Sequence, residues 1–445
     1  MNRNRMYLKI SATLLASFVF IFSACKKYDT AFVQSPDERI NTAIKKYQSA
    51  LTGSPAGWNA TIRTQTGGIY HYHFRFTDSN RVKMYSDFNQ STAGTVGESS
   101  YRLKALQTPS LLFDTYSYLH LLSDPDGNVN GGIDGVGLAS DFEFSLDSLA
   151  ADSILLTGRV HGTKLTLIKA TQQDFDAWQN GRWATTLAFE NINKIQNYFR
   201  RLIIGGVNYE IRVNTLARTI TFTWIDASGN SRQFTTDYYY SATGVVFVTP
   251  FNTGTQTVNG LEIVSWDAGN SILNVKVNGV ATTISGATKP LKIDLAAPQR
   301  WWQYAVSNGG LYWISVDGFH VNGVDDAFGI KTLPDYYYLI YWPGIQPASG
   351  PPFDAVAPAF LIASQNSLDL QYGLALTPDF KSDGRVVFTY SGDVVGPYPT
   401  TGPAALTKTQ FLFPQGYYFV QTSATSFDMV SSTDAKAWIS WYFIF

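Results

Sequence analysis

One side chain of this sequence stands where covalent modification is expected: Cys25, the single cysteine among 445 residues. It follows the small residues Ser23 and Ala24 and the apolar run 8–22, which is short for a membrane span. This order is typical of a lipoprotein signal peptide, removed as residues 1–24. Acyl chains on Cys25, at about 0.8 kcal/mol per buried CH2, would anchor the chain to outer-membrane lipid. The alternative is a buried thiol behind an ordinary leader.

A glycine-rich loop has the spacing of oxygen ligands for calcium. Asp124, Asp126 and Asn128 occupy every second position, as in calcium-binding loops. Val129 stands where such a loop has its turn glycine, and no glutamate closes the pattern. We therefore expect a turn-rich loop and no cofactor, with calcium at these three residues as the alternative.

Two pairs of titratable residues each share one face of an expected strand. His71 and His73 have a spacing that suits zinc, but Arg75 on the same face would oppose a dication and favours a solvent-facing polar stripe. Asp141 and Glu143 resemble the carboxylates of glycosidases, which usually come from different strands, so a polar outer face is favoured again. We find no motif for a nucleophile elbow, a phosphate loop or a metalloprotease. A non-catalytic protein is therefore favoured. Catalytic residues that come together from distant strands would not be found by a search for local motifs.

Aromatic residues in the last third of the chain are candidates for ligand stacking. Successive strand residues point to opposite faces, so a run of three tyrosines places at least one away from the core. We predict Trp313, Trp342 and Tyr337 as platforms for a sugar or peptide, with Asp317 supplying hydrogen bonds. The alternative is a pair of packed sheets with tyrosines at their margins.

The elements that must position these residues are mostly strands. Aromatic residues make up 15% of the chain, and period-two alternation begins at Trp58. Before it, Ser35 as N-cap and Glu38 in a capping box predict a one-sided helix over 36–52, packed through Ile40, Ile44, Tyr47 and Leu51. A second helical stretch, 172–199, is broken at Asn180-Gly181. A proline-rich run within 343–358 reads as a surface loop.

We expect a mainly β fold of two or three antiparallel sandwich-like domains, with an N-terminal capping helix and a helical connector. Segments 142–162 and 261–279 echo each other, which indicates a duplicated β unit or a chance similarity of β sequences. Whether the last two domains are continuous stays open. The expected parts are the signal peptide 1–24, a tether 25–34, an N-terminal helix plus β domain 35–171, the connector 172–199, a second β domain 200–296 and a C-terminal β domain 297–445.

Several segments carry a pattern that extends over nearly the whole mature chain. They are Arg39-Ile40, Tyr47, Gly57-Trp58, Ser99-Ser100-Tyr101-Arg102-Leu103-Lys104, the run 109–116, Leu119-His120, Asp124-Pro125, Asp141-Phe142-Glu143-Phe144 and Gly416-Tyr417-Tyr418-Phe419-Val420. Together they resemble an uncharacterised lipoprotein family of Bacteroidetes, known as a domain of unknown function (4302). The resemblance implies an outer-membrane lipoprotein encoded among uptake systems for glycans or peptides, and it implies no reaction.

These observations favour a lipid-anchored outer-membrane binding or accessory protein in glycan or peptide capture. An outer-membrane transporter complex is the expected partner, and the face of the membrane on which the protein lies stays open. The alternatives are a hydrolase of glycans or peptides and a structural component of an uptake complex. A net charge of −1 without a basic run argues against nucleic acid as a partner.

Overall fold

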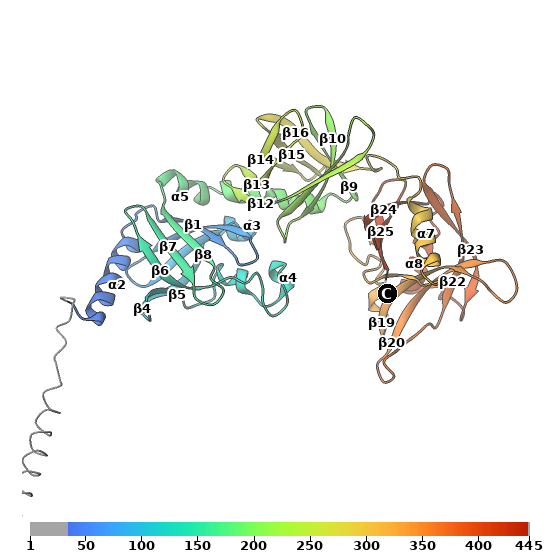
Figure 1. Ribbon diagram of the computed structural model, residues 1–445, viewed down its shortest axis with the longest axis horizontal. Coiled ribbons are helices and arrows are strands. Elements are labelled where there is room, and N and C mark those ends of the chain that lie inside the picture. Colours follow the sequence, from blue (N-terminus) through green and yellow to red (C-terminus); the bar gives the residue numbers. More distant parts are fainter. Residues whose placement is uncertain (1–33, 444–445) are drawn as a thin grey trace, which may run out of the picture.

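The computed structural model describes residues 34–443, which form three β units that follow one another along an arch (Figure 1). The fold is mainly β, as predicted. The predicted calcium loop, aromatic residues and connector lie within this part of the chain, whereas the signal peptide and Cys25 lie outside it. Within the described residues, no helix combines the length and apolar character needed to cross a membrane.

The first unit is a closed barrel of eight antiparallel strands. Each strand pairs with the next, and β1 also pairs with β8, which closes the sheet. Alternate side chains point inward because the side-chain period of a strand is two. The strands are β1 (Trp58–Arg63), β2 (Ile69–Phe76), β3 (Arg81–Ser86), β4 (Gly97–Ala105), β5 (Pro109–Phe113), β6 (Glu143–Leu149), β7 (Ser153–Gly158) and β8 (Lys164–Lys169).

The second unit repeats this arrangement. Its eight strands pair in sequence, and β16 returns to β9. The two echoing segments fall on β6 and β7 of the first barrel and on β14 and β15 of the second, so they occupy equivalent places. The strands are β9 (Phe199–Ile204), β10 (Val207–Asn214), β11 (Thr219–Ile225), β12 (Ser231–Ser241), β13 (Gly244–Asn252), β14 (Thr257–Asp267), β15 (Ile272–Val277) and β16 (Val280–Ala287).

The third unit is a ten-stranded sheet in which β17 pairs with both β19 and β26, so its ends also meet. The expected sandwich form is therefore not confirmed, because pairings between strands at the two ends curl each sheet on itself. The strands are β17 (Trp313–Ser315), β18 (His320–Val321), β19 (Tyr336–Ile345), β20 (Phe353–Ile362), β21 (Ser367–Asp369), β22 (Gly373–Phe380), β23 (Arg385–Val394), β24 (Tyr417–Ser423), β25 (Ser426–Ser431) and β26 (Ala437–Phe443).

Helices cover or plug the three sheets. The capping box at α2 (Pro36–Thr52) is present as predicted, with Ser35 Oγ accepting from Glu38 N at 3.2 Å. Tyr47 and Leu51 of α2 are buried against the first barrel. The other helices are α3 (Gln90–Gly94), η1 (His120–Ser123), α4 (Gly127–Asn130), α5 (Gln172–Gln179), α6 (Arg182–Thr186), η2 (Leu187–Lys194), α7 (Ala297–Ser307), η3 (Ile330–Thr332) and α8 (Gly402–Phe411).

The connector helices α5, α6 and η2 join the first two barrels. The chain breaks where expected, with Asn180 ending α5 and Gly181 in the left-handed region at φ 72°. Trp178 and Trp183 stack with ring centroids 4.1 Å apart. Trp178 is buried in the second barrel's hydrophobic cluster, so the connector is part of that core and not a free linker.

A buried ion cluster fastens the first barrel to the second. The Arg218 guanidinium donates to the Ile69 carbonyl at 2.8 Å and pairs with Asp87 at 3.3 Å, and both side chains are almost inaccessible. His71 contacts the same carboxylate at 3.2 Å. Arg218 also lies over the Tyr70 ring, 3.9 Å from its centroid. Because a buried charge is costly without its partner, this cluster holds the two barrels in one relative position.

Candidate functional site

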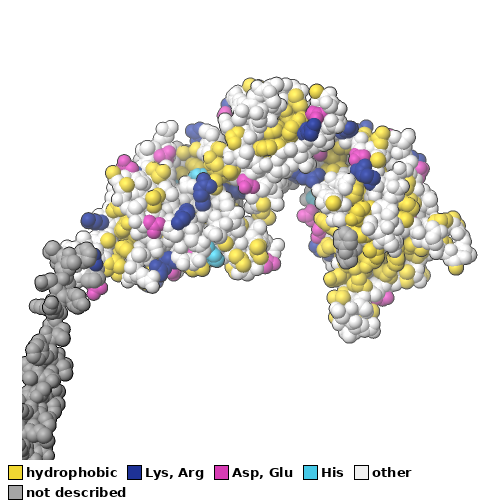
Figure 2. Space-filling model, viewed as in Figure 1, with side chains coloured by type: hydrophobic (Ala, Val, Ile, Leu, Met, Phe, Trp, Pro, Cys, Tyr) yellow, Lys and Arg dark blue, Asp and Glu magenta, His cyan; other side chains and the backbone are white. Residues whose placement is uncertain are grey.

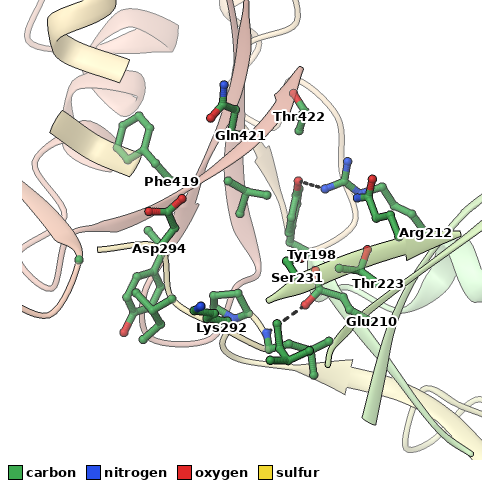
Figure 3. A pocket seen from close by; sticks show the side chains of 18 of the residues that line it. Tyr198, Glu210, Arg212, Thr223, Ser231, Lys292, Asp294, Phe419, Gln421 and Thr422 are labelled. Atoms are coloured by element: carbon green, nitrogen blue, oxygen red, sulfur yellow. Dashed lines mark hydrogen bonds between the residues drawn. The ribbon is translucent and has the colours of Figure 1, made fainter. Parts of the chain in front are cut away.

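The strongest candidate site is a cleft of about 780 Å³ between the second barrel and the C-terminal unit (Figure 3). Its walls come from β10, β11 and β12 on one side and from β24 on the other. Segment 290–296 and the first turn of α7 complete it. This volume falls in the range of sites that hold small molecules or short polymers.

The barrel wall of the cleft is a polar face. Ile211 and Phe222 point into the barrel core, so their neighbours along each strand point outward into the cleft. The hydroxyls of Thr221 and Thr235 lie 2.8 Å apart. The strand register forms two rows across this wall, Glu210–Thr223–Gln233 and Arg212–Thr221–Thr235.

The opposite wall combines strand β24 with the segment that leads into α7. Gln421 and Thr422 of β24 are exposed, and Figure 3 shows both on the strand across from the barrel wall. Arg300 pairs with Asp294 at 2.6 Å and donates to Gln421 Oε1 at 3.2 Å. Hydrogen-bond donors and acceptors therefore approach the cleft from both sides.

The floor of the cleft is the contact between the two units. Tyr198 donates its hydroxyl to Asp428 Oδ2 at 2.5 Å and accepts from Arg212 at 2.9 Å. The backbone N–H of Tyr198 donates to the Ala435 carbonyl at 2.7 Å. Burial raises the pKa of the Tyr198 phenol, helped by the Asp428 charge, so the phenol stays a donor. This chain of polar contacts sets the separation of the walls.

Two carboxyl groups of the cleft have pKa values pushed in opposite directions. Burial raises the pKa of Glu210, although Arg201 lies 3.8 Å away and the Leu291 N–H donates to it at 3.3 Å. Hydrogen bonds from Arg300 lower the pKa of Asp294. Such divergence is a feature of acid–base sites, and it also arises in structural ion pairs.

The predicted aromatic platforms lie elsewhere, on the C-terminal unit. Trp313 is fully buried and donates from Nε1 to the Trp301 carbonyl at 3.1 Å, so the expectation of a free indole face there is wrong. Its strand turns this residue into the sheet's interior. Trp342 and Tyr337 are exposed by 37% and 50%. Asp317 lies 3.4 Å from Lys331 on the surface. None of these four residues lines the cleft.

The predicted calcium loop is held by its own backbone. Asp124 Oδ1 accepts from Asp126 N at 3.0 Å, and Asp126 Oδ1 accepts from Asn128 N at 2.9 Å as the cap of α4. In the described part of the chain no group of three or more His, Cys, Asp or Glu could hold a metal ion. Calcium at this loop stays a prediction.

The two paired motifs serve the fold. His73 is buried and stacks on Phe175 of α5, and burial lowers its pKa to about 4. The expected solvent-facing stripe on β2 is therefore wrong, because the connector covers that face. Asp141 is also buried, and accepts N–H groups from Val160, His161 and Thr163, which fixes the turn before β8. Neither motif belongs to the cleft.

Sequence reasoning missed the cleft residues for an identifiable reason. The alternation Thr219-Ile220-Thr221-Phe222-Thr223 indicates a strand with one polar face, but neighbouring residues in sequence do not show which segment lies opposite that face.

The lipidation site Cys25 lies outside the described residues, so lipidation stays a prediction.

Comparison with known proteins gives one informative match. The model of the family described as Domain of unknown function (DUF4302) matches residues 28–267, from the tether to β14. No curated protein matches the chain.

Comparison with solved structures shows only a weak likeness. The DNA polymerase III subunit beta from Pseudomonas aeruginosa is 9% identical, with 91% of this chain and 97% of that chain covered and a TM-score of 0.12. The DNA polymerase III beta subunit from Thermotoga maritima is 8% identical, with 91% and 97% covered and a TM-score of 0.13. At these TM-scores the likeness carries no argument about fold or function.

Proposed function

The chain belongs to the DUF4302 family, and we propose that it is a lipid-anchored outer-membrane protein that captures a glycan or peptide without converting it. The observation that carries this proposal is the cleft, whose two polar rows face the exposed edge of β24. Hydroxyl, amide and charged groups there suit a ligand rich in hydroxyls or amides.

The proposed location at the outer membrane rests on Cys25 and the signal peptide before it. An anchor at that end places the described β units beyond a short tether, 25–34, at the membrane surface. An outer-membrane transporter complex is the proposed recipient of the ligand. Basic and acidic side chains are interspersed on the face drawn in Figure 2, which fits a neutral or zwitterionic ligand better than a polyanion.

A second surface supports the same proposal. Trp342 and Tyr337 are exposed on the C-terminal unit, with Tyr312 5.7 Å from Trp342 between ring centroids. Aromatic faces of this kind suit stacking on a sugar ring or a peptide side chain.

The second candidate function is hydrolysis of a glycan or peptide, favoured by the Glu210 and Asp294 pair. A carboxyl with a raised pKa can donate a proton at neutral pH while an ionised carboxylate acts as base or nucleophile. Glu210→Gln distinguishes the two functions. Conversion of a bound ligand that the wild type carries out and Glu210→Gln abolishes supports hydrolysis, whereas a ligand that the wild type binds and leaves unconverted supports capture.

The test of binding uses the full chain carrying Cys25→Ser, screened against oligosaccharides and peptides by thermal unfolding. A ligand at 100 times its Kd should stabilise the protein by about 2.7 kcal/mol. Thr223→Arg, which places a bulky cation in the cleft, should weaken binding by about tenfold or more. Thr283→Arg is the matched control, because Thr283 is exposed on β16 of the same barrel and does not line the cleft. Equal binding by both variants would remove the cleft as the site.

A further inference from the structure

Strand β24 has an edge that lacks a partner strand for most of its length. It pairs with β25 from Tyr417 to Ser423, but with β23 only at Tyr417 and Tyr418. Among the described residues, no strand pairs with the outer edge from Phe419 onward. In an antiparallel strand, every second residue directs its N–H and C=O to the same edge. The outer edge therefore carries unpaired backbone donors and acceptors.

This unpaired edge opens into the cleft. Residues 418–422 all line it, Val420 is half-buried, and Gln421 and Thr422 are exposed. Segment 290–296 also lines the cleft, and Arg300 in the first turn of α7 reaches β24 through its side chain, which donates to Gln421 Oε1. In the described part of the chain, no backbone hydrogen bond joins that segment to β24. The edge is therefore accessible to a ligand.

This edge lacks charged and proline safeguards against strand pairing, although it is short and its register with β25 shifts between Gln421 and Ser423. Native proteins protect exposed edges with lysine, proline, inward charges or a covering element. The run Phe419-Val420-Gln421-Thr422 holds no charge and no proline. The edge lies within the cleft, whose volume of about 780 Å³ is enough for a short extended chain.

We propose that the cleft binds a peptide in extended conformation, which adds as a strand to the free edge of β24. This inference rests on the proposed capture function and narrows its ligand class to peptides. Main-chain hydrogen bonds to β24 give affinity that does not depend on sequence, and the two polar rows of the barrel wall contact alternate side chains. The regular part of the free edge, Phe419 to Gln421, matches about three residues of a bound peptide at about 3.3 Å per residue.

Charges around the edge extend this recognition to the peptide's side chains. Arg212 and Lys292 supply cations, and Glu210 and Asp294 supply carboxyl groups, all lining the same cleft. The balance of signs fits peptides of mixed composition. A glycan is the less favoured occupant, because its hydroxyls do not reproduce the alternating N–H and C=O pattern that an edge strand requires.

The experiment changes the backbone of the peptide ligand and leaves the protein unchanged. Acetylated and amidated hexapeptides of differing side chains are assayed singly against the full chain carrying Cys25→Ser. The best binder is then remade with every second amide N-methylated, which removes donors while it keeps the side chains. We expect the N-methylated peptide to bind about 10- to 100-fold more weakly. Amide hydrogen exchange over residues 417–423 should slow with the plain peptide only.

Each other outcome overturns the inference in a recognisable way. If the N-methylated peptide binds as well as the plain one, the strand-addition mode is wrong, although peptide capture survives. If no hexapeptide binds but an oligosaccharide protects the cleft, the ligand class is wrong and the capture function survives. If no peptide and no oligosaccharide distinguishes Thr223→Arg from Thr283→Arg, both the inference and the proposed cleft function fail.

Discussion

Replacing Glu190 with glutamine should remove most of the pH dependence of stability at the joint between the two barrels. Glu190 lies in η2, and burial raises its pKa to about 7 from 4.5, while Arg218 and a hydrogen bond from the Gln90 backbone oppose the shift. Asp87, already paired with Arg218, raises the pKa further. The native state therefore keeps a proton on Glu190 that the unfolded chain releases at lower pH.

The magnitude follows from the two pKa values. Because the pKa of Glu190 is higher in the folded state, its contribution to the free energy of unfolding is fully present below about pH 4.5. This contribution is lost progressively as the pH rises to about 7. A difference of about 2.5 units at about 1.36 kcal/mol per unit gives about 3 kcal/mol as the upper value. Glutamine stays neutral, so Glu190→Gln should match the wild type near pH 4.5 and exceed its free energy of unfolding by about 2–3 kcal/mol at pH 8.

The assay is urea unfolding followed by tryptophan fluorescence at four pH values from 5 to 8. The difference between variant and wild type removes, to first order, the contributions of groups that the substitution leaves unchanged. Glu262→Gln is the control, because Glu262 is exposed and paired with Lys276 on the surface of β14. If the Glu190→Gln difference does not grow with pH, or if Glu262→Gln reproduces it, the reasoning about burial is refuted.

Other substitutions test the joint, the core and the anchor. Arg218→Met leaves Asp87 buried without its cation and should lower the free energy of unfolding by about 3–5 kcal/mol in denaturant titration; a change below 1 kcal/mol would contradict this. Trp313→Ala should lower the free energy of unfolding by about 3–5 kcal/mol in the same assay, because Trp313 is fully buried. Trp342→Ala at the surface should leave the free energy of unfolding nearly unchanged. It should weaken ligand binding if the exposed aromatic surface contacts the ligand. Cys25→Ser should move the protein from membranes to the soluble fraction on centrifugation, and a variant that stays with membranes would disprove lipidation.

Features that depend on neighbours in sequence could be predicted from the residues alone. The capping box of Ser35 and Glu38 satisfies backbone groups within one turn, so its spacing is enough to place the start of α2. The break at Asn180-Gly181 is equally local, since glycine adopts the positive φ that ends a helix without strain. Period-two alternation from Trp58 onward indicated a chain made mostly of strands, because the direction of a side chain in a strand depends only on its position.

Features that depend on distant segments required the tertiary structure. The face of β2 with His71 and His73 looks polar in sequence, yet the connector packs over it and buries His73. Trp313 belongs to an aromatic run that suggested a surface, but pairing of its strand with β19 and β26 turns it inward. The cleft itself exists because β10–β12 and β24, about 200 residues apart in the chain, face each other. Local spacing determines how each segment folds, whereas long-range pairing and burial decide which faces meet, and the ligand site lies where they meet.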